Sequence, residues 1–381
     1  MMPSAPTFIL AGGGTGGHLT PGLAVAEALR RLSPGCRIVF AGGDRPIDQL
    51  LLAREERRIL PSEPLRNIWR HPWRFMVAHG RAWRLAKEMV AELSPRSVCG
   101  LGGITSLPPI YAAHRVKIPT FALEQNVVPG RANRFLSKSI GAICTSFAET
   151  QPLLPPNVSI VQTGNPVRGD IAKLTASPSK PIHRRTTVLV LGGSQGAQPL
   201  NDAILALLAN APPEFKKFRW VHQAGPNRTG PKSRAAPSAS GQEISDASAI
   251  LSQAYKQAGV SAEVAPFFND LDSRLPNAAL AITRAGATTL AELACAATPA
   301  VLIPYPQATD RHQEVNALYY AAGGAALIVP QEPDLNQFAS QLADTLRPLL
   351  LDTGRLQHLS DAMRLLAIPG AADEVARLLM R

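Results

Sequence analysis

The run Ala11-Gly-Gly-Gly-Thr-Gly-Gly-His18 combines five glycines in six positions with one histidine. Glycine lets a backbone adopt positive φ values and approach a ligand closely. A helical pattern begins just after the run, where Thr20 would be the N-cap and Pro21 the first helical residue. Because a helix N-terminus favours anions, we expect a phosphate-binding turn with His18 at its edge.

His18 is the candidate catalytic group of this turn. Neutral imidazole accepts a proton readily near neutral pH, so His18 could act as a general base. The alternative is a histidine that caps or packs against the loop. Glu124 and Asn126 directly follow the apolar segment 120–123, and ligands of open α/β sheets gather beyond such strand ends. Glu124 could orient or charge-stabilise His18, or it could belong to a cluster that caps a helix at 131–136.

Two further polar groups follow apolar segments in the second half of the chain. In the run Arg284-Ala-Gly-Ala-Thr-Thr-Leu-Ala-Glu292, Thr288 and Thr289 can cap a helix and donate to phosphate. Glu292 could accept hydrogen bonds from both hydroxyls of a ribose, or it could only complement the helix dipole. Asp310-Arg-His-Gln313 offers donors and acceptors suited to sugar hydroxyls and an acetamido group, although an ordinary polar helix start would look the same.

The elements that must position these residues alternate between short apolar segments and helical patterns. That alternation is typical of βαβ units and a parallel sheet. A second glycine loop, 192–197, follows the apolar segment 187–191 just as the first loop follows 7–10. We therefore predict an α/β fold with two Rossmann-like, doubly wound parallel-sheet domains facing a central cleft.

The 381 residues are long enough for these two domains. We place the first at 1–165 and the second at 166–352, and we expect the helices of 353–381 to pack back toward the first domain. The segment 169–185 has little apolar period and is expected to link the domains. The segment 225–249 is rich in glycine, proline and serine and is expected to be a surface insertion.

Composition and net charge limit the classes of partner that this protein is expected to bind. The formal net charge of +11 suits phosphorylated ligands, an anionic membrane surface or nucleic acid. Aromatic residues make up only 5%, and neither a zinc-like spacing nor a basic recognition helix is present, so we expect no nucleic acid. The four cysteines lie far apart in apolar segments, as reduced core thiols would. Without a signal peptide or an apolar run of about 18 residues, a cytoplasmic location is expected.

One segment, 65–87, suits contact with a membrane surface. It interleaves arginines with apolar and aromatic residues and contains three of the four tryptophans. Such side chains fit the headgroup layer of an anionic membrane. The residues expected there are Trp69, Arg70, Trp73, Arg74 and Phe75. The alternative is a core-facing helix with a solvated basic face.

The spacing Gly12-x-Gly14-x-x-Gly17 formally matches a dinucleotide-binding fingerprint. That site also needs an acidic residue at the end of the second strand to hold the ribose. Here the segment 37–41 runs into Gly42-Gly43, and Asp44 lies only beyond them. The segment 219–223 also ends without an acid, so we do not expect a dehydrogenase.

Six motifs together resemble those of the nucleotide-sugar-dependent glycosyltransferases with two Rossmann-like domains, the GT-B arrangement, and in particular their peptidoglycan branch. They occur in order from Gly12 to Asn316. In sequence they are Gly-Gly-Thr-Gly-Gly-His18, Glu124-Gln-Asn126, Gly164-Asn-Pro-Val-Arg168, Gly-Gly-Ser194-Gln-Gly-Ala197, Arg284-x-Gly-Ala-Thr288-Thr289-x-x-Glu292 and Asp310-Arg-His-Gln313.

The resemblance implies transfer of N-acetylglucosamine from UDP-N-acetylglucosamine to the C4 hydroxyl of the lipid-linked muramyl-pentapeptide, lipid I, with inversion and without a metal or other cofactor. It also implies peripheral attachment to the cytoplasmic face of the anionic inner membrane, with proteins of cell-wall synthesis as partners. The family's membrane-docking surface corresponds to the segment 65–87.

Roles for single residues follow from the resemblance by matching position. His18 would be the general base, with Glu124 and Asn126 shaping the acceptor side. Glu292 would hold the ribose, Phe268 would lie beside the uracil, and His312 with Gln313 would recognise the sugar. The remaining residues expected to bind substrate are Thr15, Gly16, Gly17, Arg168, Ser194, Asn201, Arg284, Ala287, Thr288 and Thr289.

Two positions depart from the family pattern on the acceptor side. Ile104 stands where the family often has tyrosine, and Leu123 stands where it commonly has histidine. Three other readings remain at this stage. They are a related glycolipid synthase that acts on diacylglycerol, a UDP-N-acetylglucosamine epimerase, and a nucleotide-sugar-binding module without activity.

Overall fold

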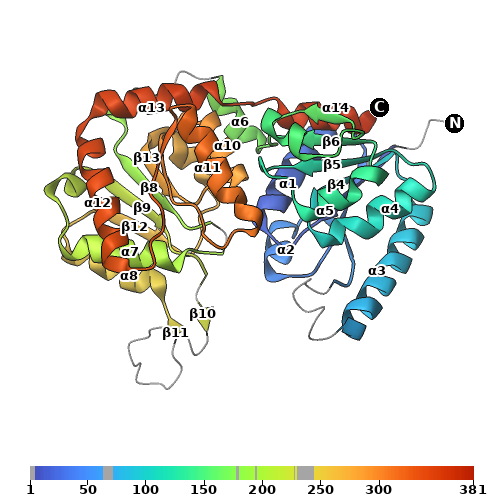
Figure 1. The fold of residues 1–381 in the computed structure, drawn as a ribbon, viewed down its shortest axis with the longest axis horizontal. Helices are drawn as coiled ribbons and strands as arrows, with labels where there is room; N and C mark the ends of the chain where they lie inside the picture. Colours follow the sequence, from blue (N-terminus) through green and yellow to red (C-terminus); the bar gives the residue numbers. More distant parts are fainter. Residues whose placement is uncertain (1–4, 63–71, 177–179, 194, 227, 230–243) are drawn as a thin grey trace. The chain divides into compact units, whose positions relative to one another are not determined.

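The computed structural model describes the chain except residues 1–4, 63–71, 177–179, 194, 227 and 230–243 (Figure 1). It contains two units, residues 1–172 with 368–381 and residues 173–367. Each unit is built on a parallel sheet with helices connecting its strands. The predicted α/β class with two parallel-sheet domains is confirmed.

The first unit has a seven-stranded sheet in the order β3-β2-β1-β4-β5-β6-β7. All neighbouring strands are parallel. Leu10 of β1, for example, pairs with Phe40 of β2 and Cys99 of β4. The strands are β1 (Thr7–Gly12), β2 (Arg37–Gly42), β3 (Glu56–Ile59), β4 (Ser97–Gly102), β5 (Thr120–Glu124), β6 (Ala142–Thr145) and β7 (Ile160–Gln162).

Helices cover both faces of this sheet because its central strands are apolar on both sides. Phe8 and Leu10 pack with α1 and α14, while Ile9 and Ala11 pack with α3 and α4. The helices are α1 (Gly16–Leu32), α2 (Pro46–Leu51), α3 (Pro72–Leu93), α4 (Leu107–Arg115), α5 (Arg131–Leu136), α6 (Gly169–Ala172) and α14 (Ala371–Met380).

The second unit has a six-stranded parallel sheet in the order β12-β9-β8-β13-β14-β15. The strands are β8 (Thr187–Leu191), β9 (Arg219–Gln223), β12 (Ala262–Ala265), β13 (Ala278–Thr283), β14 (Ala300–Leu302) and β15 (Ala326–Ile328), and an antiparallel pair is formed by β10 (Arg228–Thr229) and β11 (Ile244–Ser245). The helices are α7 (Gln198–Ala209), α8 (Ala247–Gln257), α9 (Leu271–Arg274), α10 (Ala287–Cys295), α11 (His312–Ala322), α12 (Leu335–Leu351) and α13 (Thr353–Leu365).

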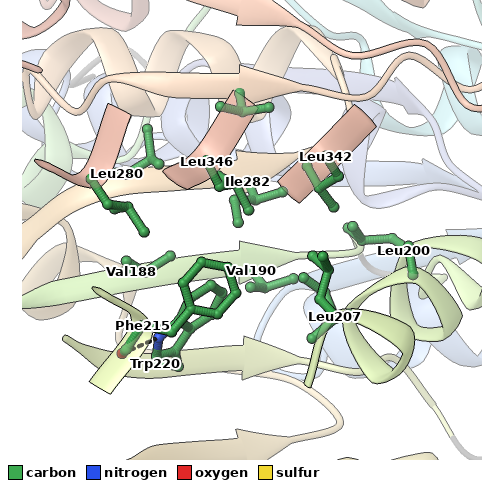
Figure 2. Close-up of a cluster of buried hydrophobic side chains, with 14 of the residues drawn as sticks. Val188, Val190, Leu200, Leu207, Phe215, Trp220, Leu280, Ile282, Leu342 and Leu346 are labelled. Carbon is green, nitrogen blue, oxygen red and sulfur yellow. Dashed lines mark hydrogen bonds between the residues drawn. The ribbon is translucent and has the colours of Figure 1, made fainter. Parts of the chain in front are cut away.

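A buried cluster joins one face of this second sheet to its helices (Figure 2). Val188 and Val190 of β8 and Leu280 and Ile282 of β13 point into it, together with leucines of α7 and α12. Trp220 is fully buried there, and its indole N–H donates to the Phe215 carbonyl at 3.1 Å. Each buried side chain of this size contributes about 2 kcal/mol, so the cluster fixes β8 and the loop that follows it.

Helix α1 begins earlier than the sequence predicts. The expected start at Thr20 and Pro21 is wrong, because Thr15 is the N-cap and Pro21 lies inside the helix. Thr15 has an extended backbone, and its carbonyl accepts hydrogen bonds from the N–H groups of His18 and Leu19, both at 3.2 Å. His18 therefore lies in the first helical turn rather than in the preceding loop.

The domain boundaries also differ from the expected ones. The first unit extends to Ala172, so the crossing falls inside the expected linker rather than at 165. The two C-terminal helices divide between the units: α13 contacts α10 and α12, whereas α14 packs on α1. Val375 and Leu379 are buried in the core of the first unit, which explains why only α14 returns to it.

Candidate active site

In the first unit, the glycine loop joins β1 to α1 at the carboxyl end of the sheet. Gly14 has a φ of +82°, a conformation that glycine adopts without strain. Its N–H donates to Asp48 Oδ1 at 2.6 Å, and its carbonyl accepts from Arg45 at 3.2 Å. The loop is therefore held by the start of α2 and delivers the chain directly into the N-terminus of α1.

The imidazole of His18 packs against a second glycine turn, the one that follows β4. A Cβ atom at Gly102 would lie 2.8 Å from His18 Cδ2 and 2.9 Å from His18 Nε2. Gly102 also has a φ of +115°, so both the backbone and the ring require glycine there. Gly12 pairs with Gly102 across β1 and β4, which brings the two turns together around the half-buried His18.

Glu124 ends β5 and is 2% exposed. Its Oε1 accepts from the Asn126 N–H at 3.1 Å, and its Oε2 accepts from the Gly130 N–H and the Asn133 amide, both at 2.8 Å. Burial raises the pKa of this carboxyl, and these donors oppose the rise. The contacts match the capping-cluster alternative, because Gly130 is the N-cap of α5. A catalytic role for Glu124 stays a prediction.

The other residues expected on the acceptor side lie near the same edge or further along the chain. Thr15, Gly16 and Gly17 form the start of α1. The Asn126 carbonyl accepts from the Thr150 hydroxyl at 3.2 Å. Arg168, also expected to bind substrate, belongs to the first unit, where its carbonyl accepts from the N–H groups of Ile171 and Ala172 in α6.

In the second unit, the loop after β8 approaches the turn after β9 very closely. A Cβ at Gly196 would lie 2.9 Å from Gly225 Cα, and one at Gly225 would lie 2.3 Å from Gly196 Cα. The Gln223 amide donates to the Gly193 carbonyl at 3.0 Å and accepts from the Phe268 N–H at 3.2 Å. Gln223 therefore joins three loops. Ser194, expected to bind substrate, lies outside the described residues.

Asn201, one of the residues expected to bind substrate, lies in a buried hydrogen-bond network. It is 1% exposed; its amide donates to the Ala224 carbonyl at 2.9 Å, and its oxygen lies 3.1 Å from His222 Nε2. The Asn201 oxygen can only accept, so His222 Nε2 carries the proton and the Tyr255 hydroxyl donates to Nδ1 across 3.2 Å. The Asn201 side chain thus fixes the turn at Ala224, and its expected contact with substrate stays a prediction.

This buried network predicts a pH dependence of stability. Burial lowers the pKa of His222 to about 3. An unfolded chain binds a proton on this histidine below about pH 6.5, whereas the folded unit does not, so stability falls as pH decreases from about 6.5 toward 3. From pH 7 to pH 5 the loss from this group is about 2 kcal/mol. Urea unfolding at both pH values should show a smaller difference for His222→Gln than for the wild type, and equal differences would contradict the prediction.

Phe268 is buried and lies in the loop after β12. It is 5% exposed, and the guanidinium of Arg274 lies 4.2 Å from its ring centroid. Arg274 is itself held by Glu263 at 2.9 Å and Asp270 at 2.8 Å. The ring is therefore fixed from one side by a cation. Its N–H, bound to Gln223, connects this loop to the glycine loop.

Two side chains join the turn after β13 to the elements around β14. Arg284 is 9% exposed and donates to the Ile303 carbonyl at 3.1 Å and to the Gln331 side chain at 2.6 Å. Burial lowers the pKa of its guanidinium to about 10. Asn316 of α11 donates to the Ala285 carbonyl at 3.2 Å. The guanidinium of Arg284 therefore holds these loops together, and its expected contact with substrate stays a prediction.

Helix α10 begins beside this braced turn, with Gly286 as its N-cap. Ala287, Thr288 and Thr289 form its first three positions, so their backbone N–H groups belong to the positive end of the helix dipole. Glu292 lies one turn after Thr288 on the same face, and both are largely buried. The spacing expected for a phosphate and a ribose contact is thus present on one helix.

The start of α11 lies at the next strand end. The Gln313 side chain accepts from the Tyr305 N–H at 3.0 Å, and His312 Nδ1 lies 2.7 Å from the Thr309 carbonyl. Asp310 and Arg311 have φ values of +52° and +54°, which non-glycine residues rarely adopt. Such strain costs about 1 to 3 kcal/mol per residue and clusters at ligand sites. The two consecutive residues make the Asp310–Gln313 turn a strained one.

The structure adds two residues that the sequence reasoning missed, Asp48 and Gln223. Each is at most 3% exposed and binds a loop backbone. Gln223 could have been found as the last polar residue of a strand. Asp48 lies three residues after Arg45, at the capping-box position of α2, and that spacing was the available signal.

The two halves of α3 differ in how deeply their apolar side chains are buried. Its second half is a core helix with Ala82, Ala86 and Met89 buried, as the alternative interpretation predicts. In its first half Trp73, Met76 and Val77 are 65%, 72% and 63% exposed. This end projects beyond its own unit (Figure 1). Trp69 and Arg70 lie outside the described residues.

Spacing in the first half of α3 places Trp73, Met76 and Val77 on one exposed face, since they are three and four residues apart. Arg74 lies 5.8 Å from the Trp73 ring centroid, and Phe75 stacks on His79 at 3.9 Å. Within the described parts of the chain, no helix is long and apolar enough to cross a bilayer.

Family models match both halves of the chain. The glycosyltransferase family 28 N-terminal domain matches residues 8–145, and the family 28 C-terminal domain matches residues 187–375. The chain belongs to glycosyltransferase family 28.

Individual relatives extend this match to the full length. A protein from Solidesulfovibrio magneticus is 36% identical over 98% of this chain and 97% of its own, and it is called UDP-N-acetylglucosamine--N-acetylmuramyl-(pentapeptide) pyrophosphoryl-undecaprenol N-acetylglucosamine transferase. The crystal structure of Acinetobacter baumannii MurG covers 98% of this chain and 99% of its own at 26% identity, with a TM-score of 0.70. A UDP-GlcNAc 2-epimerase from Neisseria meningitidis shares the fold, with a TM-score of 0.64 over 98% and 99% of the two chains, but is only 12% identical.

Proposed function

We propose that this protein transfers N-acetylglucosamine from UDP-N-acetylglucosamine to undecaprenyl-pyrophosphoryl N-acetylmuramyl-pentapeptide, producing lipid II from lipid I. The observation that carries this proposal is the 36% identity, across almost the whole of both chains, to a relative named for that reaction. The similar epimerase structures are 12 to 14% identical to this chain and show a shared fold alone.

The chemistry is a single displacement. The C4 hydroxyl oxygen of the acceptor bonds to the anomeric carbon of the donor as the bond from that carbon to the UDP oxygen breaks, so an α donor gives a β product. His18 takes the hydroxyl proton. Its ring lies against the turn at Gly102 and Gly103, just after β4, and this placement supports the role. UDP leaves with the bonding electron pair as an anion.

Stabilisation of the departing UDP falls to the second unit. The N-terminus of α10, with Thr288 and Thr289, and the loop after β8 supply backbone donors and helix dipoles suited to a diphosphate. Glu292 holds the ribose, and His312 with Gln313 recognises the acetamido sugar. The side-chain hydrogen bonds of Gln223, Arg284 and Asn316 support this assignment, because they hold these loops in a fixed conformation.

The lipid-linked acceptor requires access to a membrane. We place the protein at the cytoplasmic face of the plasma membrane, attached peripherally through the exposed half of α3. Trp73, Met76 and Val77 suit the boundary between headgroups and acyl chains, and neighbouring arginines suit anionic headgroups.

The double variant Trp73→Ala/Met76→Ala should bind anionic liposomes about tenfold more weakly, because it removes most of the exposed apolar area of this face. Flotation with liposomes checks this, and transfer to a soluble acceptor analogue should be unchanged. Leu351→Ala, which removes an exposed apolar side chain from α12 instead of α3, serves as the control. Undiminished association of the double variant would remove α3 as the attachment site.

The experiment that tests the proposed reaction is radiolabelled transfer from UDP-N-acetylglucosamine to a lipid I analogue. We expect a labelled β-linked product with lipid I, none with diacylglycerol, and the same rate with a chelator present. Incubation without acceptor should leave the donor sugar unepimerised. Product with diacylglycerol alone, or epimerised donor without acceptor, would overturn the proposal.

A further inference from the structure

Asp48 is a buried carboxylate that no step of the proposed reaction uses. It is 1% exposed, although it lies in the short helix α2 near the surface. Its Oδ1 accepts from the Gly14 N–H at 2.6 Å, and its Oδ2 accepts from the Arg45 N–H at 2.9 Å. Both oxygens are therefore committed to backbone groups, one of them in the glycine loop 34 residues earlier.

The backbone around Asp48 is shaped to admit this carboxylate. A Cβ at Gly13 would lie 3.1 Å from Asp48 Oδ1, and a Cβ at Gly43 would lie 3.4 Å from Oδ2. Arg45 completes the arrangement, since its guanidinium donates to the Gly14 carbonyl at 3.2 Å. The N–H of Gly14 is thus bound by the Asp48 side chain and its carbonyl by the Arg45 side chain, both at the start of α2.

The position of Gly14 determines the start of α1. Thr15 follows it as the N-cap, and the Thr15 carbonyl accepts from the N–H of His18. A shift of Gly14 would move this first turn, and with it the imidazole that packs on Gly102. The Gly14 N–H is already hydrogen-bonded to the Asp48 carboxylate. An anionic ligand would therefore bind to the N–H groups that follow Gly14.

We propose that Asp48 is a positioning residue, which holds Gly14 and through it the start of α1 and His18 in the geometry that the acceptor site requires. This inference rests on the proposed transferase function. The loop meets the acceptor in that proposal, so Asp48 acts on acceptor use and on turnover. It does not act on the donor, whose residues lie on other loops.

The test compares Asp48→Asn and Asp48→Ala with the wild type in the lipid I transfer assay. Asparagine keeps one acceptor atom but places a donor against the second N–H, so its effect should lie between wild type and alanine. We expect Asp48→Ala to lower kcat roughly tenfold and to raise the acceptor KM, because small displacements of a reacting group are costly. The donor KM and UDP affinity should stay within about twofold.

Asp44→Asn is the matched control. This carboxylate lies on the same segment, is largely exposed, and pairs with Arg57 at 2.7 Å. We expect its kinetics to match the wild type. A merely structural role for Asp48 would lower the melting temperature and the active fraction with an unchanged acceptor KM, and that result would overturn the inference. If Asp48→Ala does not fold, the kcat and the acceptor KM of Asp48→Asn test the inference instead.

Failure of this inference is distinguishable from failure of the proposed function. Wild-type protein that transfers the sugar normally, with Asp48 variants that behave like Asp44→Asn, would refute the positioning role alone. Wild-type protein without transfer to lipid I would refute the function on which it rests.

Discussion

Replacing His18 by alanine is expected to lower kcat by a factor of about 10² to 10⁴, the usual contribution of a general base. UDP affinity should be nearly unchanged, because the proposed donor residues lie in the second unit. Steady-state transfer to a lipid I analogue and calorimetric titration with UDP check the two parts separately. His114→Ala, which removes an exposed histidine at the end of α4, controls for the loss of a histidine in the same unit.

The pH profile sharpens this test. If neutral His18 is the base, wild-type kcat/KM should fall on the acid side as the imidazole becomes protonated, and that limb should disappear in His18→Ala. A purely structural histidine would instead give a lower melting temperature and keep the acid limb. Because the ring packs on Gly102, the melting temperature of each variant must be measured beside its kinetics.

Most of the sheet could be predicted because parallel strands covered on both faces appear in sequence as continuous apolar runs. β1 and β8 show this pattern plainly. One strand of the first sheet does not. β3 is the edge strand Glu-Arg-Arg-Ile, whose charged residues remain half-exposed. An edge strand needs no second apolar neighbour, so periodicity gives no signal for it.

The candidate site could be located but its internal contacts could not. Polar residues that follow apolar runs must gather at one edge of a parallel sheet, and this places His18 and Glu292 at such edges within their own units. Whether a polar side chain faces a ligand or the protein interior depends on packing between distant elements. Asn201 and Arg284 turn inward onto backbone carbonyls, and Glu124 is engaged by its own loop.

Replacing Glu292 by alanine is expected to weaken donor binding by at least about 100-fold, because a carboxylate that accepts two ribose hydroxyls forms two charge-assisted hydrogen bonds of about 1.5 to 3 kcal/mol each. Helix α10 supplies the geometry: Glu292 lies one turn from Thr288 and is 7% exposed. Glu292→Gln keeps an acceptor without the charge and should lose less. Asp344→Ala, on the exposed side of α12, is the control and should bind UDP normally.

Ligand variants separate a ribose contact from a structural role of Glu292. UDP without its 2′ and 3′ hydroxyls should bind the wild type weakly and should bind Glu292→Ala about as well as UDP does. The loss of affinity caused by Glu292→Ala and the loss caused by removing the two hydroxyls would then not be additive, as expected for groups in direct contact. Additive losses would show that Glu292 acts elsewhere, for example by supporting the fold of α10. Acceptor KM at saturating donor should remain that of the wild type, since the glycine loop around His18 belongs to the other unit.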